Sequence, residues 1–133
     1  IIGVDYGKKR TGLAVTDSLQ IIVSALDTVE TPKLMDYFET YISKEAVEKI
    51  VIGLPVHADG NFTDLKGDID CFATCIKRKF PHIEIDFADE QFSSVYAKQI
   101  ILESGIKKKK RQDKSLIDKI SAVVILQRYL KHI

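Results

Sequence analysis

Three acidic residues, Asp5, Glu90 and Asp118, occupy positions from which a carboxylate could take part in catalysis. Asp5 ends an apolar run and stands directly before Tyr6 and Gly7. Aspartate is disfavoured in strands, and a charge there costs free energy unless it is paired or bound to metal. Asp5 is therefore a candidate ligand or catalytic group. The alternative is an aspartate that caps the turn at Gly7.

Glu90 follows the segment Phe87–Asp89, just past the end of an expected strand. Carboxylates at strand ends beside the start of a helix gather at functional sites in α/β sheets. An acidic residue in the first turn of the next helix would look the same, because the helix dipole favours negative charge there. Both interpretations stay open at this point.

Asp118 also admits two interpretations. Ser115 and Asp118 have the spacing of a capping box, which would give Asp118 a purely local role. If the helix instead begins nearer Asp113, Asp118 lies in the second turn and shares a face with Ala122 and Ile125. The small Ala122 beside Asp118 would then let the helix approach a sheet closely.

Three carboxylates at the ends of different elements suit the binding of hard divalent cations. Mg²⁺ and Mn²⁺ take oxygen ligands and accept waters and phosphate oxygens in the rest of their shell. Two such ions about 4 Å apart can activate water and stabilise the leaving oxygen of a phosphodiester. The three acids thus predict metal-dependent phosphodiester hydrolysis with one or two ions.

Two basic clusters flank the acids in the sequence. Lys8, Lys9 and Arg10 follow Asp5 closely, and five basic residues occupy positions 107–111. A run of like charge is usually a solvated loop. Beside candidate catalytic acids, these clusters favour a polyanionic substrate such as a nucleic acid, although the net charge is only +1.

Alternating and continuous apolar runs predict the elements that would carry these residues. We expect strands over 1–6, 12–16, 21–28, 49–53 and 83–87, with helices over 32–44, 63–79, 93–104 and 115–130. Thr31 would cap the first helix ahead of Pro32, and Asp59-Gly60 would form a turn. This order predicts an α/β fold with a mixed sheet, helices on its faces and the run Lys49–Gly53 near its centre.

Two further expectations concern side-chain faces. Cys71 and Cys75 would share one face of a helix, as two buried core thiols. One side of the last helix carries the following residues: Leu116, Ile120, Val123, Val124, Gln127 and Leu130.

Length and composition restrict the class of protein. The 133 residues, 45% of them apolar and 29% charged, predict a single globular domain over 1–133. The sequence has neither an apolar run near the ~18 residues of a membrane span nor a secretion signal at its start. We therefore expect a cytoplasmic protein without a membrane partner, either a monomer or a weak dimer.

Four sequence blocks together resemble the YqgF family over essentially the whole chain: VDYGKKRTGLAVTD, IVIGLP with its following DG turn, FADEQFSS and KKKKRQDKSLIDKISAVVILQ. The resemblance implies an RNase H-like fold with a five-stranded mixed sheet. It also implies a nuclease, assigned in this family either to 5′-end processing of pre-16S ribosomal RNA in ribosome biogenesis or to Holliday junction resolution.

The resemblance assigns a common role to the three acids, with Asp5, Glu90 and Asp118 as catalytic and metal-binding residues. We expect the basic residues beside them to contact phosphates, namely Lys9, Arg10, Lys110 and Arg111. The chain departs from the family pattern at two positions. Gln91 stands where arginine is usual, which puts one phosphate or structural contact in doubt, and Ser121 replaces the first alanine of Asp-x-x-Ala-Ala.

Three alternative functions remain. The first is a resolvase acting on four-way DNA junctions, since carboxylates do not distinguish RNA from DNA. The second is a fragment of an actin-like sugar kinase or ATPase, whose phosphate loop also has Asp-x-Gly, but the chain is short and lacks a second glycine-rich loop. The third is a nucleic-acid-binding module without catalytic activity.

Overall fold

The computed structural model describes residues 1–17, 19–54, 65–89, 99–100, 102 and 114–131. Five strands form one sheet in the order β3-β2-β1-β4-β5. Their bounds are β1 Ile2–Asp5, β2 Arg10–Thr16, β3 Val23–Glu30, β4 Lys49–Leu54 and β5 Glu84–Asp89. The first three strands pair antiparallel, whereas β1, β4 and β5 run parallel. The expected mixed sheet and its strands are confirmed, with ends that shift by at most two residues.

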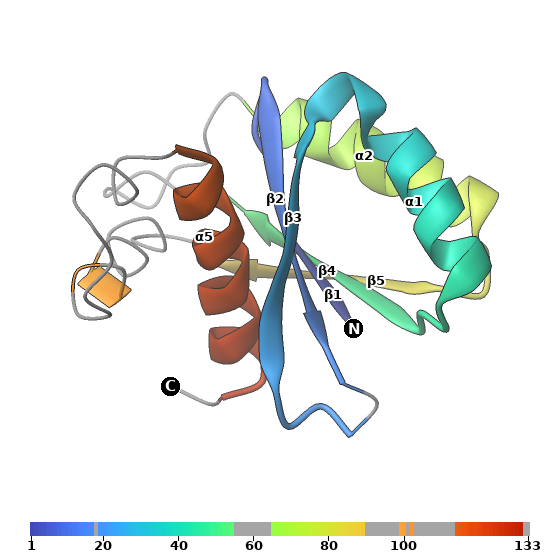
Figure 1. Ribbon diagram of the computed structural model, residues 1–133. Coiled ribbons are helices and arrows are strands. Elements are labelled where there is room, and N and C mark those ends of the chain that lie inside the picture. Colours follow the sequence, from blue (N-terminus) through green and yellow to red (C-terminus); the bar gives the residue numbers. More distant parts are fainter. Residues whose placement is uncertain (18, 55–64, 90–98, 101, 103–113, 132–133) are drawn as a thin grey trace.

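Helices cover both faces of the sheet (Figure 1). The short 3₁₀ helix η1 (Thr31–Lys33) leads into α1 (Leu34–Lys44), and α2 spans Lys66–Lys79. Both α1 and α2 lie on one face, and α5 (Lys114–Tyr129) lies on the other. The expected helix over 93–104 and the turn at 59–60 fall mostly or wholly outside the described residues.

Strand alternation divides the core between the two faces. Ile2 and Val4 of β1 pack with Ile50 and Ile52 of β4 against α1 and α2. Ala14 and Val51 pack with Ala122, Ile125 and Leu126 of α5. Since successive residues of a strand point to opposite faces, the α5 face of β1 carries Gly3 and Asp5.

The exposed cysteines correct one expectation. Cys71 and Cys75 are free thiols on the exposed side of α2. The buried stripe of this helix instead consists of Ile69, Phe72, Ala73 and Ile76. These four residues already satisfy the helical spacing that a core-facing stripe requires, so the two cysteines fall outside it.

The role expected for Thr31 was also wrong. The side chain of Thr31 caps neither η1 nor α1. Its hydroxyl donates to the carbonyl of Gly7 at 2.6 Å, and the Thr11 hydroxyl lies 2.9 Å away. Because a hydroxyl has one proton, Thr11 must donate to Thr31. The backbone N–H of Thr31 donates to the carbonyl of Lys9, so the end of β3 fixes the β1–β2 hairpin.

Candidate functional site at the carboxyl end of β1

Asp5 lies at the end of β1, the central strand of the sheet, on the face that α5 covers. Gly3, two residues earlier, has no room for a side chain because Leu126 of α5 occupies the space. Asp5 follows at the point where β1 ends, and its residue is half-buried. Its carboxylate therefore belongs to the layer between the sheet and α5, at the edge where the parallel strands end.

Asp118 reaches the same place through a close contact between α5 and β2. A Cβ atom on Gly12 would overlap the carbonyl oxygen of Asp118 and lie 3.1 Å from its Cβ. Only glycine allows this approach. Asp118 is the fifth residue of α5, in its second turn. This placement corresponds to the helix start near Asp113 rather than to the capping box with Ser115.

Gly12 connects the two acids. It is the antiparallel partner of Asp5, and such partners have Cβ atoms about 4.5–5.5 Å apart on the same face. Together with the contact to Asp118, this pairing places the Cβ atoms of Asp5 and Asp118 within about 9 Å of each other. Two carboxylates at that separation can share a cation whose ligand bonds are each about 2 Å long.

Asp5 and Asp118 have the chemistry that a hard divalent ion prefers, because both offer carboxylate oxygens. Within the part of the chain that the structure describes, no three His, Cys, Asp or Glu residues form a group that could hold an ion. The third predicted acid, Glu90, directly follows β5 in the sequence and lies outside the described residues, as do Lys110 and Arg111. The structure therefore brings together two of the three predicted carboxylates and does not test the third.

Arg10 makes a contact that the sequence did not predict. It was expected to meet phosphates, but its Nε donates to Oδ2 of Asp118 at 2.9 Å. The side chains of Arg10 and Asp118 are 41% and 24% exposed, so the pair lies at the surface. Neighbouring Lys9 is exposed on the same hairpin. Arg10 thus stands at the edge of the carboxylate site.

A second polar network fixes the other end of α5. The Tyr129 hydroxyl donates to Oδ2 of Asp86 at 2.6 Å, and Nζ of Lys49 donates to the same hydroxyl at 3.1 Å. The hydrogen bond that Tyr129 donates is the main cause that lowers the pKa of Asp86, and the hydrogen bond that Lys49 donates to Tyr129 is the main cause that raises the pKa of Lys49. These residues join α5 to β4 and β5. This network could not be predicted from the sequence, because its members are far apart in the chain.

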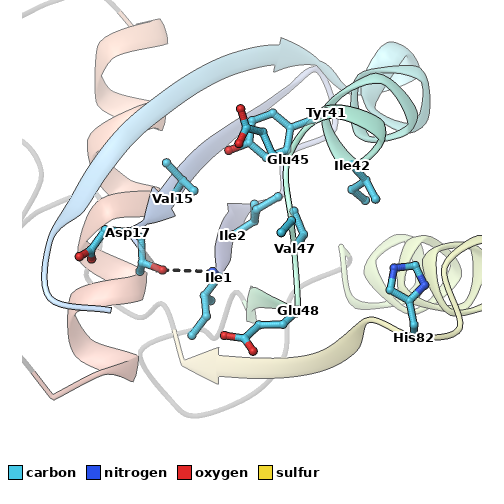
Figure 2. A pocket seen from close by; sticks show the side chains of 12 residues that line it. Ile1, Ile2, Val15, Asp17, Tyr41, Ile42, Glu45, Val47, Glu48 and His82 are labelled. Carbon is cyan, nitrogen blue, oxygen red and sulfur yellow. Dashed lines mark hydrogen bonds between the residues drawn. The ribbon is translucent and has the colours of Figure 1, made fainter. Parts of the chain in front are cut away.

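A large cavity of about 810 Å³ opens at the opposite edge of the sheet, where β1 begins. The Ile1 nitrogen donates to the Thr16 hydroxyl at 3.1 Å, and Figure 2 shows Asp17, Glu45 and Glu48 around the cavity. The cavity lies the length of β1 away from Asp5, roughly 13 Å at the rise of a strand. It is therefore separate from the carboxylate site.

Comparison with known proteins identifies the family. The model of the family described as RuvX: Holliday junction resolvase matches residues 1–132. A protein of Bacteroides thetaiotaomicron named "Putative pre-16S rRNA nuclease" is 45% identical over 131 residues, 98% of this chain and 95% of that protein. Proteins with the same name from Porphyromonas gingivalis and Flavobacterium johnsoniae are 48% and 45% identical over 130 residues, covering 98% of this chain and 94% of each relative. The chain belongs to the RuvX family, also called YqgF, whose members have the RNase H-like fold and act on nucleic acids as hydrolases.

Proposed function

We propose that the protein is a metal-dependent nuclease in which Asp5, Glu90 and Asp118 are the metal-binding and catalytic carboxylates. The observation that carries this proposal is the contact between Gly12 and Asp118, which brings a carboxylate of the last helix beside the carboxylate of the first strand. A close approach of this kind excludes any side chain at position 12. Local capping of α5 would not require it.

The chemistry follows from the charge of the site. One or two Mg²⁺ or Mn²⁺ ions, when bound, would activate water and stabilise the leaving oxygen of the phosphodiester. Asp5 and Asp118 would hold the ion on the α5 side of the sheet edge, and Glu90 would complete the ligand set. Clustered acids repel one another, so they favour binding of a cation.

The basic residues would then contact the substrate. Arg10 now donates to a carboxylate, and a guanidinium binds phosphate oxygens with the same planar donors. Lys9, Lys110 and Arg111 would neutralise phosphates without reading sequence. Their contribution predicts that nucleic-acid affinity falls steeply with added salt through counterion release.

The substrate that the relatives' names favour is precursor 16S ribosomal RNA, with cleavage in the processing of its 5′ end. Ribosome biogenesis would place the protein in the cytoplasm. Within the described residues, no helix is long and apolar enough to span a membrane. The description of the family model favours a second candidate, resolution of four-way DNA junctions.

The test is cleavage of a structured RNA that contains the precursor 5′ end of 16S rRNA, with Mg²⁺ or Mn²⁺ and with EDTA. We expect metal-dependent cleavage by the wild type and loss of cleavage in Asp5→Asn and Asp118→Asn. Asp36→Asn, an exposed acid on α1, is the matched control. Cleavage by Asp5→Asn at the wild-type rate would overturn the proposal.

A four-way DNA junction, assayed in parallel, distinguishes the two substrates. A resolvase would cut two strands symmetrically and generally acts as a dimer, whereas the processing of an RNA end requires neither property. Binding of RNA and DNA without cleavage of either, at every metal concentration, would instead favour the non-catalytic module.

A further inference from the structure

A small pocket opens on the other face of the sheet, one residue along the chain from Asp5. Its volume is about 230 Å³. Tyr6, Leu34, Met35 and Phe72 form its apolar walls, and the polar residues of its lining are Thr31, Asp68, Cys71 and Cys75. We call these eight residues the Tyr6 pocket.

The Tyr6 pocket and the carboxylate site share one hairpin. Asp5 and Tyr6 are neighbours whose side chains point to opposite faces of β1. Thr31 lines the pocket and donates to the carbonyl of Gly7. Arg10, at the other end of that hairpin, bonds to Asp118. A strand of nucleic acid that crosses the end of β1 would therefore meet both sites.

The size and walls of the pocket suit one flat ring system. Pockets that hold whole drug-sized ligands are larger, about 300–1,000 Å³. The Tyr6 ring lies 5.6 Å from that of Phe72 at an angle of 36°, and it packs against the core cluster that contains Phe72, so its position is fixed. A half-buried aromatic ring held in this way is a stacking platform, and every nucleobase has a face that can stack on it.

The polar side of the pocket provides an acceptor. Asp68 is exposed in the first turn of α2, on the pocket rim. Burial of the Tyr6 hydroxyl is the main cause that raises its pKa, and the negative charge of Asp68 raises this pKa further. The two groups are therefore near each other. A carboxylate accepts from the exocyclic amino group of a base such as cytosine. Uracil and thymine carry no such group.

We propose that the Tyr6 pocket binds one unpaired nucleobase of the substrate, close to the bond that is cleaved, and favours a base with an exocyclic amino group. This proposal rests on the proposed function for the identity of the ligand as nucleic acid. The base that occupies the pocket must lie in a single-stranded segment, because a base in a duplex leaves the stack only at a cost in free energy. The pocket would thus select an unpaired nucleotide beside the scissile phosphate.

The two exposed cysteines allow a direct test in the full-length protein. N-ethylmaleimide, a neutral thiol reagent, would be applied to the wild type in EDTA with an adenine decanucleotide RNA. The control ligand is an abasic oligonucleotide of the same length and charge. We expect the adenine strand to slow modification of Cys71 and Cys75 severalfold and the abasic strand to leave it unchanged. The Cys71→Ser and Cys75→Ser variants assign the effect to each thiol.

A second measurement concerns affinity. In a fluorescence anisotropy titration, the adenine strand should bind at least about fivefold more tightly than the abasic strand. A fivefold difference in affinity corresponds to the lower end of what stacking on an aromatic ring contributes. Tyr6→Leu should remove this preference and Tyr6→Phe should keep it. Asp68→Asn should reduce the preference for cytosine over uracil strands.

The outcomes separate this proposal from the nuclease function. Tight adenine-strand binding with unprotected thiols, or an undiminished preference in a folded Tyr6→Leu, overturns the base pocket even if the protein cleaves RNA. Protected thiols without cleavage at any metal concentration would support the pocket and contradict the nuclease.

Discussion

Arg10 and Asp118, separated by 108 residues in the sequence, are joined by a hydrogen bond of 2.9 Å from Nε to Oδ2. Exposed ion pairs contribute only about 0–1 kcal/mol to stability. The main consequence of this pair is therefore positional. A cation of the protein holds the carboxylate that we propose as a metal ligand.

Replacing Arg10 should strengthen metal binding. In Arg10→Gln the Asp118 carboxylate no longer has a competing cation, so Mn²⁺ should bind up to about fivefold more tightly, the affinity equivalent of an exposed ion pair. Isothermal titration of the nucleic-acid-free protein measures this change. Lys8→Gln, on the same hairpin, removes the same charge and should have a smaller effect. Equal affinities in the two variants would show that Arg10 does not compete for the site.

Substitution at Gly12 should separate α5 from the sheet. In Gly12→Ala the new Cβ overlaps the Asp118 carbonyl, so the free energy of unfolding should fall by about 1–3 kcal/mol or more. Cleavage should fall as well, because Asp118 must move. Gly67→Ala in α2 is the control, because a Cβ at Gly67 would meet no atom within 4 Å. This substitution should stabilise the protein by about 0.4–1 kcal/mol. Urea unfolding of both variants tests the contrast.

The protein should be more stable with alanine in place of Ser121. The Ser121 hydroxyl is buried and has no hydrogen-bond partner among the described residues. A buried polar group without a partner costs about 1–3 kcal/mol, so Ser121→Ala should raise the free energy of unfolding by about 1 kcal/mol. Ser43→Ala, which removes an exposed hydroxyl, should change it by less than about 0.5 kcal/mol. A Ser121→Ala variant less stable than the wild type would contradict the conclusion that the Ser121 hydroxyl has no hydrogen-bond partner.

The network at Tyr129 should make stability depend on pH. The pKa of Asp86 is lowered in the folded state, so its contribution is present above pH 3.8 and is lost as the pH falls through the folded pKa. The pKa of Lys49 is raised, so its contribution is present below pH 10.5 and is lost as the pH rises through the folded pKa.

Tyr129→Phe removes the largest cause of both shifts. It should destabilise the protein by about 0.5–1 kcal/mol at pH 7, a small value because Asp86 is exposed. The difference from wild type should shrink on acidification to pH 3, as measured by urea unfolding. For Tyr41→Phe, a control outside the network, the difference should not change between these two pH values. If the difference in free energy of unfolding between Tyr129→Phe and the wild type is the same at both pH values, the Tyr129 hydroxyl does not stabilise the Asp86 carboxylate.

The strands were predictable from the sequence because their apolar patterns are local. The run Lys49–Gly53 is apolar on both faces and lies between β1 and β5, as a strand buried on both sides should. Asp5 was conspicuous for the same reason, as a charge at the end of such a run. These features need only the chain's own periodicity.

The faces of the last helix were harder to predict. The sequence placed Leu116 and Ile120 together on one side of the helix, whereas the residues that α5 packs against the sheet are Ala122, Ile125 and Leu126. The helix carries apolar residues on several sides, so periodicity alone does not choose between them. The choice depends on Gly12 and Gly3, which lie on other elements and let α5 approach the sheet at Asp118 and Leu126.

The partners of the hairpin could not be predicted for a similar reason. Thr31 precedes a proline and resembles a helix cap, yet its hydroxyl bonds to Gly7, 24 residues away. Arg10 resembles a phosphate ligand and bonds to Asp118. Polar side chains take the partner that the assembled fold brings near, and single-sequence reasoning assigns them local partners by default.

The close contact between Gly12 and Asp118 also determines when the site can exist during synthesis. The ribosome makes β1 and β2 first and α5 after all five strands, so the two carboxylates meet only when the last helix docks. A nascent chain that lacks α5 has Asp5 without Asp118, and it exposes Ala14 and Val51 of the uncovered sheet face. The same step that completes the fold thus brings together the two carboxylates that we propose as metal ligands.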